Sequence, residues 1–534
     1  MLNEIKSKII LKFIFNHLKP KLKLKLLHHN KEMQWKLNIT LKDFEKYKLL
    51  KELNERYELN ISDLDEKKIE VRGKSEYIKE ILENIKRIEF KEITEISIHL
   101  NCRFPIIKYL ENMKLDKLEI LNLKDCELTD IDILEKLNCE ELKVLNLNTN
   151  NIPHIKILEK TNFKKLEILS LKSNKIENID VLQKVDFPKL KVLQLDHNEI
   201  RDIKTLEKVN FKNLEILSLY STKFINCDFL KKVNFIELKE LNIGFNFISD
   251  INVLEKVSFK KLENLILSEN IISNIDILEK ANFNNLRNLN ISYNKISDIN
   301  ILEKVSFEKL EILDLGYNNI DSINILAKVN FKDLKQLILQ RNNISNINVL
   351  SKVKFDKLEI LDFDRNKIYN IDILEKANFK ELKKLYLFDN YISDISILEK
   401  VNFEKLETLH LGNNNIKDIN VFSKVNFKNL KILGLYFNKI EDMSVFENVK
   451  FDKIEYINIG SNKISDITPL AKMDFKELKE LILNDNPIDD IDILEDINFS
   501  KLERLCIIRN GFRFENVSWF YKFLQGKGIN LIYH

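Results

Sequence analysis

The stretch FEKLEILDLGYNNIDSINILAKVN, Phe307 to Asn330, is one copy of a 24-residue unit that repeats along most of this 534-residue chain. Phenylalanine returns at an unbroken spacing of 24 in fifteen units, from Phe163 to Phe499, and Leu115 and Cys139 open two more in the same register. Phe90 opens a degenerate unit that is longer by one residue. With the phenylalanine numbered 0, the unit reads F-x-x-L-x-x-L-x-L-x-x-N-x-I-x-x-I-x-x-L-x-x-V-x. A fixed period of this length predicts a solenoid in which each unit stacks on its neighbours.

The letters of the unit predict a short strand, a turn and a short helical segment. Positions 6 and 8, Leu313 and Leu315 in this copy, alternate with positions 5, 7 and 9, which is the period of a strand with one buried face. Position 11 is Asn in most units, and a buried Asn318 would bond backbone groups where the chain leaves the strand. Asp, Ser or Asn at positions 14, 15 and 17 would cap a short helical turn, and the phenylalanines would form a stacked row behind the strands.

The string L-x-x-L-x-L-x-x-N-x-I-x-x-I-x-x-L resembles leucine-rich repeats, most of all the type found in the phosphatase regulator SDS22 and in bacterial internalins. The resemblance covers residues 90–510 and implies an α/β solenoid, a curved array of about 17–18 units with the strands on its concave face. Those families have slightly shorter units, and the extra residues of this chain lie around V-x-F. Because the matching letters build the scaffold, the resemblance predicts the fold rather than the function.

The residues outside the repeats predict caps, because a solenoid needs polar covers over its terminal units. Residues 511–534 are expected to form a C-terminal cap, with a helix at about 515–525 and a last strand at 530–533. Residues 1–89 are expected to form a helical N-terminal region, in which 1–50 holds twelve Lys against four acidic residues. One interpretation of this region is an N-terminal cap whose lysines face water.

A second interpretation rests on IFNHLKPKLKLKLL, residues 14–27, which resembles an F-box. The matching positions that would bind an adaptor are Ile14, Phe15, Leu18 and Pro20. The resemblance implies binding of a Skp1-type adaptor through residues 1–50 and a role as substrate receptor of a cullin-type ubiquitin ligase. The Leu-Pro pair that opens such motifs is absent, and Trp35 lies two residues beyond the expected tryptophan. A membrane-surface or nucleic-acid role for the basic stretch is a third interpretation.

Composition and motifs exclude several classes of function. The 86 basic and 83 acidic residues leave a net charge of +3, which indicates no general binding to nucleic acid. No phosphate-binding loop, zinc-protease motif or nucleophile elbow occurs, the eight histidines do not cluster, and the five cysteines predict neither a disulfide framework nor a zinc site. We therefore expect no enzyme and no catalytic, cofactor-binding or metal site. The N-terminus lacks signal-peptide features and no run of 18 apolar residues occurs, so we expect an intracellular protein without a membrane span.

Comparison of one unit with another identifies a candidate binding surface. Positions 6, 8 and 11 barely change, whereas positions 7, 9, 10 and 12 vary freely and belong to the expected concave surface. Tyr and Arg gathered there are typical of protein interfaces, although exposed aromatic residues can also be simple strand formers. The candidate partner-binding residues are Tyr293, Asp314, Tyr317, Arg341, Asp362, Asp364, Arg365, Tyr386, Phe388, Asp389 and His410. Their mixed charge favours a protein partner over nucleic acid.

The sequence thus predicts a non-enzymatic scaffold that binds a protein on the concave face of the repeat sheet. The substrate receptor of a cullin-type ubiquitin ligase is one alternative, and a protein phosphatase regulatory subunit of SDS22 type is the other. Both alternatives rest on resemblance rather than on side chains whose chemistry requires them.

Overall fold

The computed structural model describes residues 68–72, 94–99, 110, 115–473, 475–495, 500–511, 525–526 and 530–532. The chain divides into two compact units, unit 1 (Met1–Phe247) and unit 2 (Ile248–His534). The predicted N-terminal helices lie outside the described residues. So does the predicted helix at about 515–525, apart from its last residue.

Unit 1 is built from short parallel strands, each followed in the repeats by one turn of 3₁₀ helix. Consecutive strands from β1 to β8 pair in parallel. The strands are β1 (Lys68–Arg72), β2 (Glu95–His99), β3 (Ile120–Asn122), β4 (Val144–Asn146), β5 (Ile168–Ser170), β6 (Val192–Gln194), β7 (Ile216–Ser218) and β8 (Glu240–Asn242). The helices are η3 (Asp132–Glu135), η4 (Lys156–Lys160), η5 (Asp180–Gln183), η6 (Ile203–Lys208) and η7 (Asp228–Lys231).

Unit 2 continues the same pattern, and its consecutive strands from β9 to β20 also pair in parallel. The strands are β9 (Asn264–Ile266), β10 (Asn288–Asn290), β11 (Ile312–Asp314), β12 (Gln336–Ile338), β13 (Ile360–Asp362), β14 (Lys384–Tyr386), β15 (Thr408–His410), β16 (Ile432–Gly434), β17 (Tyr456–Asn458), β18 (Glu480–Ile482), β19 (Arg504–Cys506) and β20 (Asn530–Ile532). The helices are η8 (Asn252–Lys256), η9 (Asp276–Glu279), η10 (Asn300–Glu303), η11 (Asn324–Ala327), η12 (Asn348–Ser351), η13 (Asp372–Lys376), η14 (Ser396–Glu399), η15 (Asn420–Ser423), η16 (Ser444–Glu447), η17 (Thr468–Lys472) and η18 (Asp492–Glu495). β20 occupies the predicted last strand.

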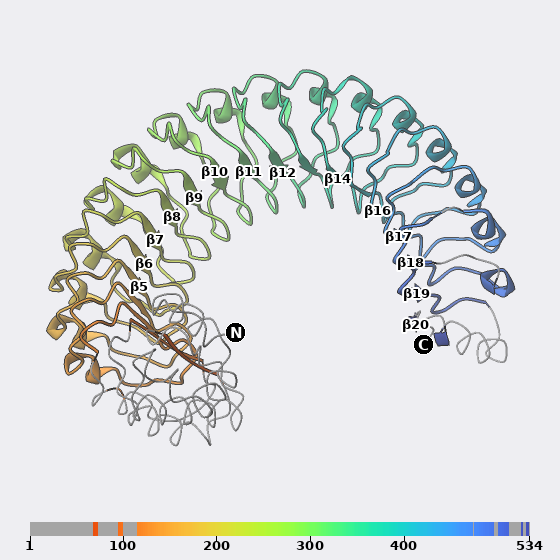
Figure 1. The fold of residues 1–534 in the computed structure, drawn as a ribbon. Helices are drawn as coiled ribbons and strands as arrows, with labels where there is room; N and C mark the ends of the chain where they lie inside the picture. Colours follow the sequence, from red (N-terminus) through yellow and green to blue (C-terminus); the bar gives the residue numbers. More distant parts are fainter. Residues whose placement is uncertain are drawn as a thin grey trace, which may run out of the picture. The chain divides into compact units, whose positions relative to one another are not determined.

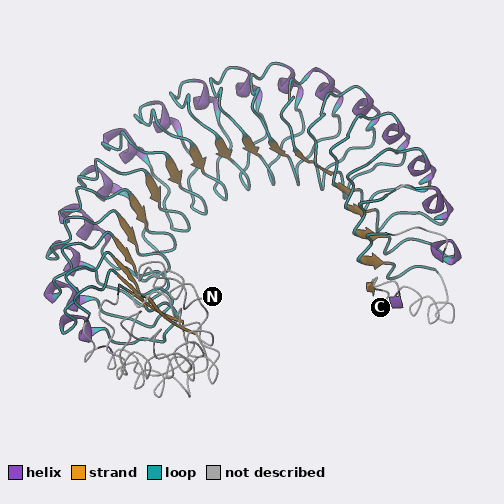
Figure 2. Cartoon of the chain, in the orientation of Figure 1, coloured by secondary structure: helices purple, strands orange, loops and turns teal. Residues whose placement is uncertain are grey.

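Each unit has two layers. Within unit 2, drawn from green to blue in Figure 1, the strands line the inner side of the curve and the helical turns line the outer side. The colouring by secondary structure in Figure 2 shows the same separation. A strand repeat of about 4.8 Å is shorter than the width of the helical layer, so parallel stacking bends the sheet toward the strands.

The core lies between these layers, as the repeat predicts. Leu313 and Leu315 are fully buried and Phe307 is 1% exposed, and the phenylalanines of the row from Phe163 to Phe475 are all buried. Each fully buried side chain of this size stabilises the fold by about 1.5–3 kcal/mol. One repeat alone cannot cover its apolar face, so this stabilisation exists only in the stack.

A ladder of buried asparagines joins successive repeats, which confirms the predicted role of position 11. Asn318 donates from Nδ2 to the carbonyls of Ile291 (3.0 Å), Leu315 (3.1 Å) and Gly316 (3.2 Å). Its Oδ1 accepts the N–H of Ile296 in the preceding repeat at 3.0 Å. The side chain thereby satisfies backbone groups of two repeats where both leave the sheet.

The helical turns are capped as predicted, by the side chain at position 15. In the repeat that begins at Phe283, Asp298 Oδ1 accepts the N–H of Asn300, the first residue of η10, at 2.8 Å. An acceptor here satisfies one of the free N–H groups at the start of a helix. Ser, Asp or Asn stands at this position before most of the turns, whereas His154 precedes η4, which has no such side-chain bond.

Position 10 takes a backbone conformation that the repeat letters did not predict. Tyr293, Tyr317, Arg341, Arg365 and Asp389 all have φ between 52° and 57°. This left-handed region costs a non-glycine residue roughly 1 kcal/mol or more. The chain keeps this conformation where it turns out of the strand. There the N–H of position 10 donates to a carbonyl of the next repeat, as in the 2.7 Å bond from Tyr317 to the Gln340 carbonyl.

A column of alternating charge precedes the strands at position 4. In unit 2 the column reads Glu263, Arg287, Glu311, Lys335, Glu359, Lys383, Glu407, Lys431, Glu455, Lys479 and Glu503. Glu311 contacts Arg287 on one side at 2.5 Å and Lys335 on the other at 2.6 Å. Parallel stacking in register would otherwise place like charges about 5 Å apart. The alternation removes that repulsion and has a period of two repeats.

Candidate protein-binding face

The side chains at positions 7 and 9 rise from the strands of unit 2 on the face opposite the leucine core. The register places Asp362 of β13 beside Tyr386 of β14, and Tyr386 beside His410 of β15. These three side chains are partly exposed. Leu361 and Leu385, which precede Asp362 and Tyr386 on their strands, are fully buried. Parallel pairing in register therefore turns the variable positions into columns that cross the strands.

Two carboxylates on β13 and the residues after it form the acidic part of this face. Asp362 Oδ1 accepts the N–H of Asp364 at 2.9 Å, and Asp364 Oδ1 accepts the N–H of Phe388 at 2.7 Å. No described residue forms an ion pair with either carboxylate. Burial raises the pKa of Asp362 to about 6, and burial together with the charge of Asp362 raises the pKa of Asp364 to about 7. The pair lacks a compensating positive charge.

Aromatic rings lie next to these carboxylates. Tyr386 and His410 meet edge to face with their ring centres 5.5 Å apart, and Phe388 stacks on Tyr436 at 5.3 Å. His410 also contacts the Tyr436 ring at 6.3 Å, and burial lowers the pKa of His410, which keeps it uncharged at neutral pH. We call Asp362, Asp364, Tyr386, Phe388, His410 and Tyr436 the acid–aromatic patch.

Glycines under the patch allow the rings to lie against the sheet. A Cβ atom on Gly412 would lie 2.8 Å from the Tyr436 ring, and one on Gly434 would lie 2.9 Å from the His410 ring. Tyr436 is not among the candidate residues named from the sequence, although the glycines of the chain point to it. Five of the nine glycines of the chain stand at position 7 or 9: Gly244, Gly316, Gly412, Gly434 and Gly460.

The side chains at position 10 of three consecutive repeats form a second cluster. The rings of Tyr293 and Tyr317 stack with their centres 3.6 Å apart, and the Arg341 guanidinium lies 4.8 Å from the centre of the Tyr317 ring. Such a cation–π contact favours a fixed side-chain position. We call these three residues the tyrosine–arginine column.

Arg365 and Asp389 continue position 10 in the two repeats after the tyrosine–arginine column, and Arg365 contacts the acid–aromatic patch. The Arg365 guanidinium lies 5.6 Å from the centre of the Phe388 ring and 3.8 Å from the Asp389 carboxylate. Asp389 also accepts a 2.6 Å hydrogen bond from Asn413 Nδ2. Asp314 lies apart from both groups, on β11, where its Oδ1 accepts the N–H of Gly316 at 2.9 Å and burial raises its pKa.

The predicted adaptor-binding residues Ile14, Phe15, Leu18 and Pro20 lie outside the described residues, as does all of 1–50. Within the part of the chain that is described, no group of three or more His, Cys, Asp or Glu side chains is placed to hold a metal ion. No helix among those described residues has the length and apolar character to cross a membrane.

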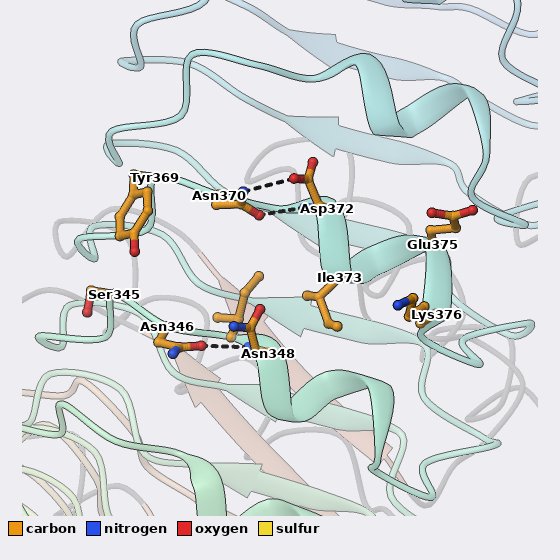
Figure 3. Close-up of a pocket in the computed structure, with 10 residues that line it drawn as sticks. Ser345, Asn346, Asn348, Tyr369, Asn370, Asp372, Ile373, Glu375 and Lys376 are labelled. Carbon is orange, nitrogen blue, oxygen red and sulfur yellow. Dashed lines mark hydrogen bonds between the residues drawn. The ribbon is translucent and has the colours of Figure 1, made fainter.

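A polar pocket of about 360 Å³ opens between the outer turns η12 and η13 (Figure 3). Asn346 and Asn370 line it, and each caps its own turn by accepting the N–H of Asn348 or Asp372 at 2.9 Å. Tyr369, at the pocket edge, is 64% exposed. Because these polar groups are the caps that recur in each repeat, the pocket is a widened gap between turns rather than an arrangement for catalysis.

Comparison with known proteins identifies the repeat. The family model described as leucine-rich repeats in two copies matches residues 380–424 and 404–448. This is a leucine-rich repeat fold. A leucine-rich repeat protein of Leptospira interrogans has a TM-score of 0.59 at 20% identity, over 80% of this chain and 98% of that one. No curated protein matches the sequence.

Two receptor structures are also similar in fold. The plant peptide hormone receptor RGFR1 in complex with RGF2 has a TM-score of 0.52 at 17% identity, over 80% of each chain. A TDR receptor has a TM-score of 0.52 at 18% identity, over 81% of this chain and 82% of that one. At these identities the likeness concerns the fold alone.

Proposed function

We propose that this leucine-rich repeat chain is a non-enzymatic scaffold that binds a protein partner on the inner face of the unit 2 sheet. The observation that carries the proposal is that the acid–aromatic patch and the tyrosine–arginine column, each held by contacts between its own side chains, lie on successive repeats of the same sheet. Tyr and Arg held in fixed positions are the residue types that dominate protein interfaces. They stand at positions that the fold does not need, since the core positions 6, 8 and 11 are constant.

Alanine variants of the full chain test the proposal. Tyr317→Ala, Arg341→Ala and Tyr386→Ala should each weaken the natural partner by about 2 kcal/mol or more, roughly thirtyfold in affinity. None of the three side chains fills the leucine core, so each change should alter stability by only about 0.5 kcal/mol.

The matched control is Lys328→Ala on the outer turn. Lys328 forms an exposed ion pair with Glu303 at 3.1 Å, which contributes at most about 1 kcal/mol. This variant should change neither binding nor the fold. Normal binding by all three inner-face variants would mean that the partner uses a flank or the N-terminal region.

A role as an F-box-like substrate receptor rests on residues 14–27, and a role as a phosphatase regulator rests on the repeat letters alone. Both stay predictions from resemblance. The inner-face scaffold is preferred because it is supported by contacts between named side chains.

A further inference from the structure

On the inner face of unit 2, carboxylates at positions 7 and 9 form no ion pair with a described residue, whereas Arg341 and Arg365 at position 10 are in contact with partners. Arg341 lies over the Tyr317 ring, and Arg365 is held by Asp389 and Phe388. In contrast, Asp314, Asp362 and Asp364 accept backbone N–H groups but form no ion pair with a described residue. Arg341 and Arg365 are therefore already engaged, whereas the carboxylates at positions 7 and 9 are available.

Aromatic rings complete the surroundings of the available carboxylates. Tyr386 stands directly beside Asp362 in the register, and the backbone of Phe388 bonds Asp364. The negative face of an aromatic ring and a neighbouring carboxylate together attract a cation that is taken from water. An ammonium or guanidinium group fits both elements, whereas a carboxylate or phosphate would meet two like charges.

We propose that the partner presents basic side chains, Lys or Arg, to the acid–aromatic patch and to Asp314 two repeats before it, from an extended segment of polyproline II type that crosses the strands of unit 2. This inference rests on the proposed function and specifies the chemistry of the partner. The raised pKa values of Asp362 and Asp364 agree with it, because a bound cation would relieve the repulsion between the two carboxylates.

The spacing of the carboxylates sets the spacing of the basic residues. Asp314 of β11 and Asp362 of β13 occupy position 7 two repeats apart, with Ile338 of β12 between them. Two strand spacings are about 10 Å. A polyproline II segment advances about 3.1 Å per residue with three residues per turn, so side chains three residues apart project from the same side, about 9 Å apart. Two basic residues separated by two others, R-x-x-R, therefore match the two sites.

The test uses synthetic peptides and the full chain. A fluorescent peptide GSRGSRGS should bind the wild-type chain at least tenfold more tightly than GSEGSEGS or GSRRGSGS. The variant Asp362→Asn/Asp364→Asn should lose at least tenfold in affinity for GSRGSRGS, since asparagine keeps the backbone hydrogen bonds but removes the charge. The control Asp321→Asn/Glu375→Gln changes net charge equally at two exposed outer residues and should stay within twofold.

Several results would overturn the inference. It falls if GSRGSRGS does not bind, if it binds both double variants equally, or if the acidic peptide binds more tightly. The natural partner separates this failure from that of the proposed function. If Tyr317→Ala and Tyr386→Ala weaken the partner but Asp362→Asn/Asp364→Asn does not, the function stands and the basic-segment inference falls. If all of these variants bind the partner normally, the proposed function falls.

Discussion

Replacing Asn318 by alanine removes four hydrogen bonds from the asparagine ladder at once, but their losses are not equal. The carbonyls of Leu315 and Ile291 keep a second donor, because Asn342 Nδ2 bonds Leu315 at 3.0 Å and Asn294 Nδ2 bonds Ile291 at 3.2 Å. Among the residues that the structure describes, the N–H of Ile296 has only the Asn318 Oδ1 as a partner, and Ile296 is fully buried. The main loss is therefore one buried donor.

A stranded buried N–H costs about 1–3 kcal/mol, and the weakened carbonyls add little because the ladder still serves them. We expect Asn318→Ala to lower the free energy of unfolding by that amount. The assay is urea denaturation of the full chain followed by circular dichroism, with the shift in midpoint multiplied by the slope of the transition. In addition, hydrogen exchange of the Ile296 amide should lose its protection relative to neighbouring repeats.

The neighbouring residue provides the control. Asn319 is exposed, and Asn319→Ala should leave both the midpoint and the Ile296 amide unchanged. Equal midpoints for the Asn318 and Asn319 variants, with the Ile296 amide still protected, would refute the reasoning. It would then follow that the ladder is a consequence of stacking and not a source of stability.

Four further predictions concern separate features. Ser461→Gly, at φ 54°, should raise the free energy of unfolding by about 0.5–1 kcal/mol in urea denaturation, while Ser345→Gly, outside the left-handed region, should not stabilise. Asp364→Asn should raise the free energy of unfolding by about 1–2 kcal/mol at pH 8 and have no effect at pH 4. The raised pKa of Asp364 means that ionisation of this carboxyl destabilises the folded state only as the pH rises from about 4 to 7, so equal effects at both pH values would contradict this. Glu311→Lys should place three cations on neighbouring repeats and lower stability by about 1–2 kcal/mol in dilute buffer, with a smaller loss in 1 M NaCl, and a salt-independent loss would exclude the charge column as its cause. If the resemblance of residues 14–27 to an F-box reflects function, the full chain should co-elute with a Skp1-type adaptor in size-exclusion chromatography and Phe15→Ala should abolish this; without co-elution of the wild type, the F-box interpretation is wrong.

Sequence patterns predicted the parts of the molecule that depend on spacing along the chain. The burial of Leu313 and Leu315, the row of phenylalanines and the bonding of Asn318 are fixed by letters that recur every 24 residues. A repeat is a local signal multiplied many times, so chance variation at one unit does not hide it. The same regularity showed which positions are variable, and these positions carry the face on which we propose that a partner binds.

The composition of the acid–aromatic patch was predictable only in part. Asp362, Tyr386 and His410 were found because they stand at variable positions, but Tyr436 was missed because its part depends on the space above Gly412. The alternation of charge at position 4 is present in the sequence, but a comparison of single repeats does not reveal it because its period is two repeats. The left-handed backbone at position 10 is not marked by one residue type, because Tyr, Arg and Asp all adopt it there.

The solenoid, its core and the identity of the outward columns follow from the amino-acid sequence alone, because a fixed period and the burial of apolar side chains are enough to specify them. The pairing of charges depends on the packed structure. Arg365 and Asp389 lie one repeat apart and form an ion pair, whereas Asp362 and Asp364 form none with a described residue, although all four stand at equally variable positions. The period places side chains in columns, but the contact between two of them depends on rotamers and on room left by glycines, which are properties of the packed stack.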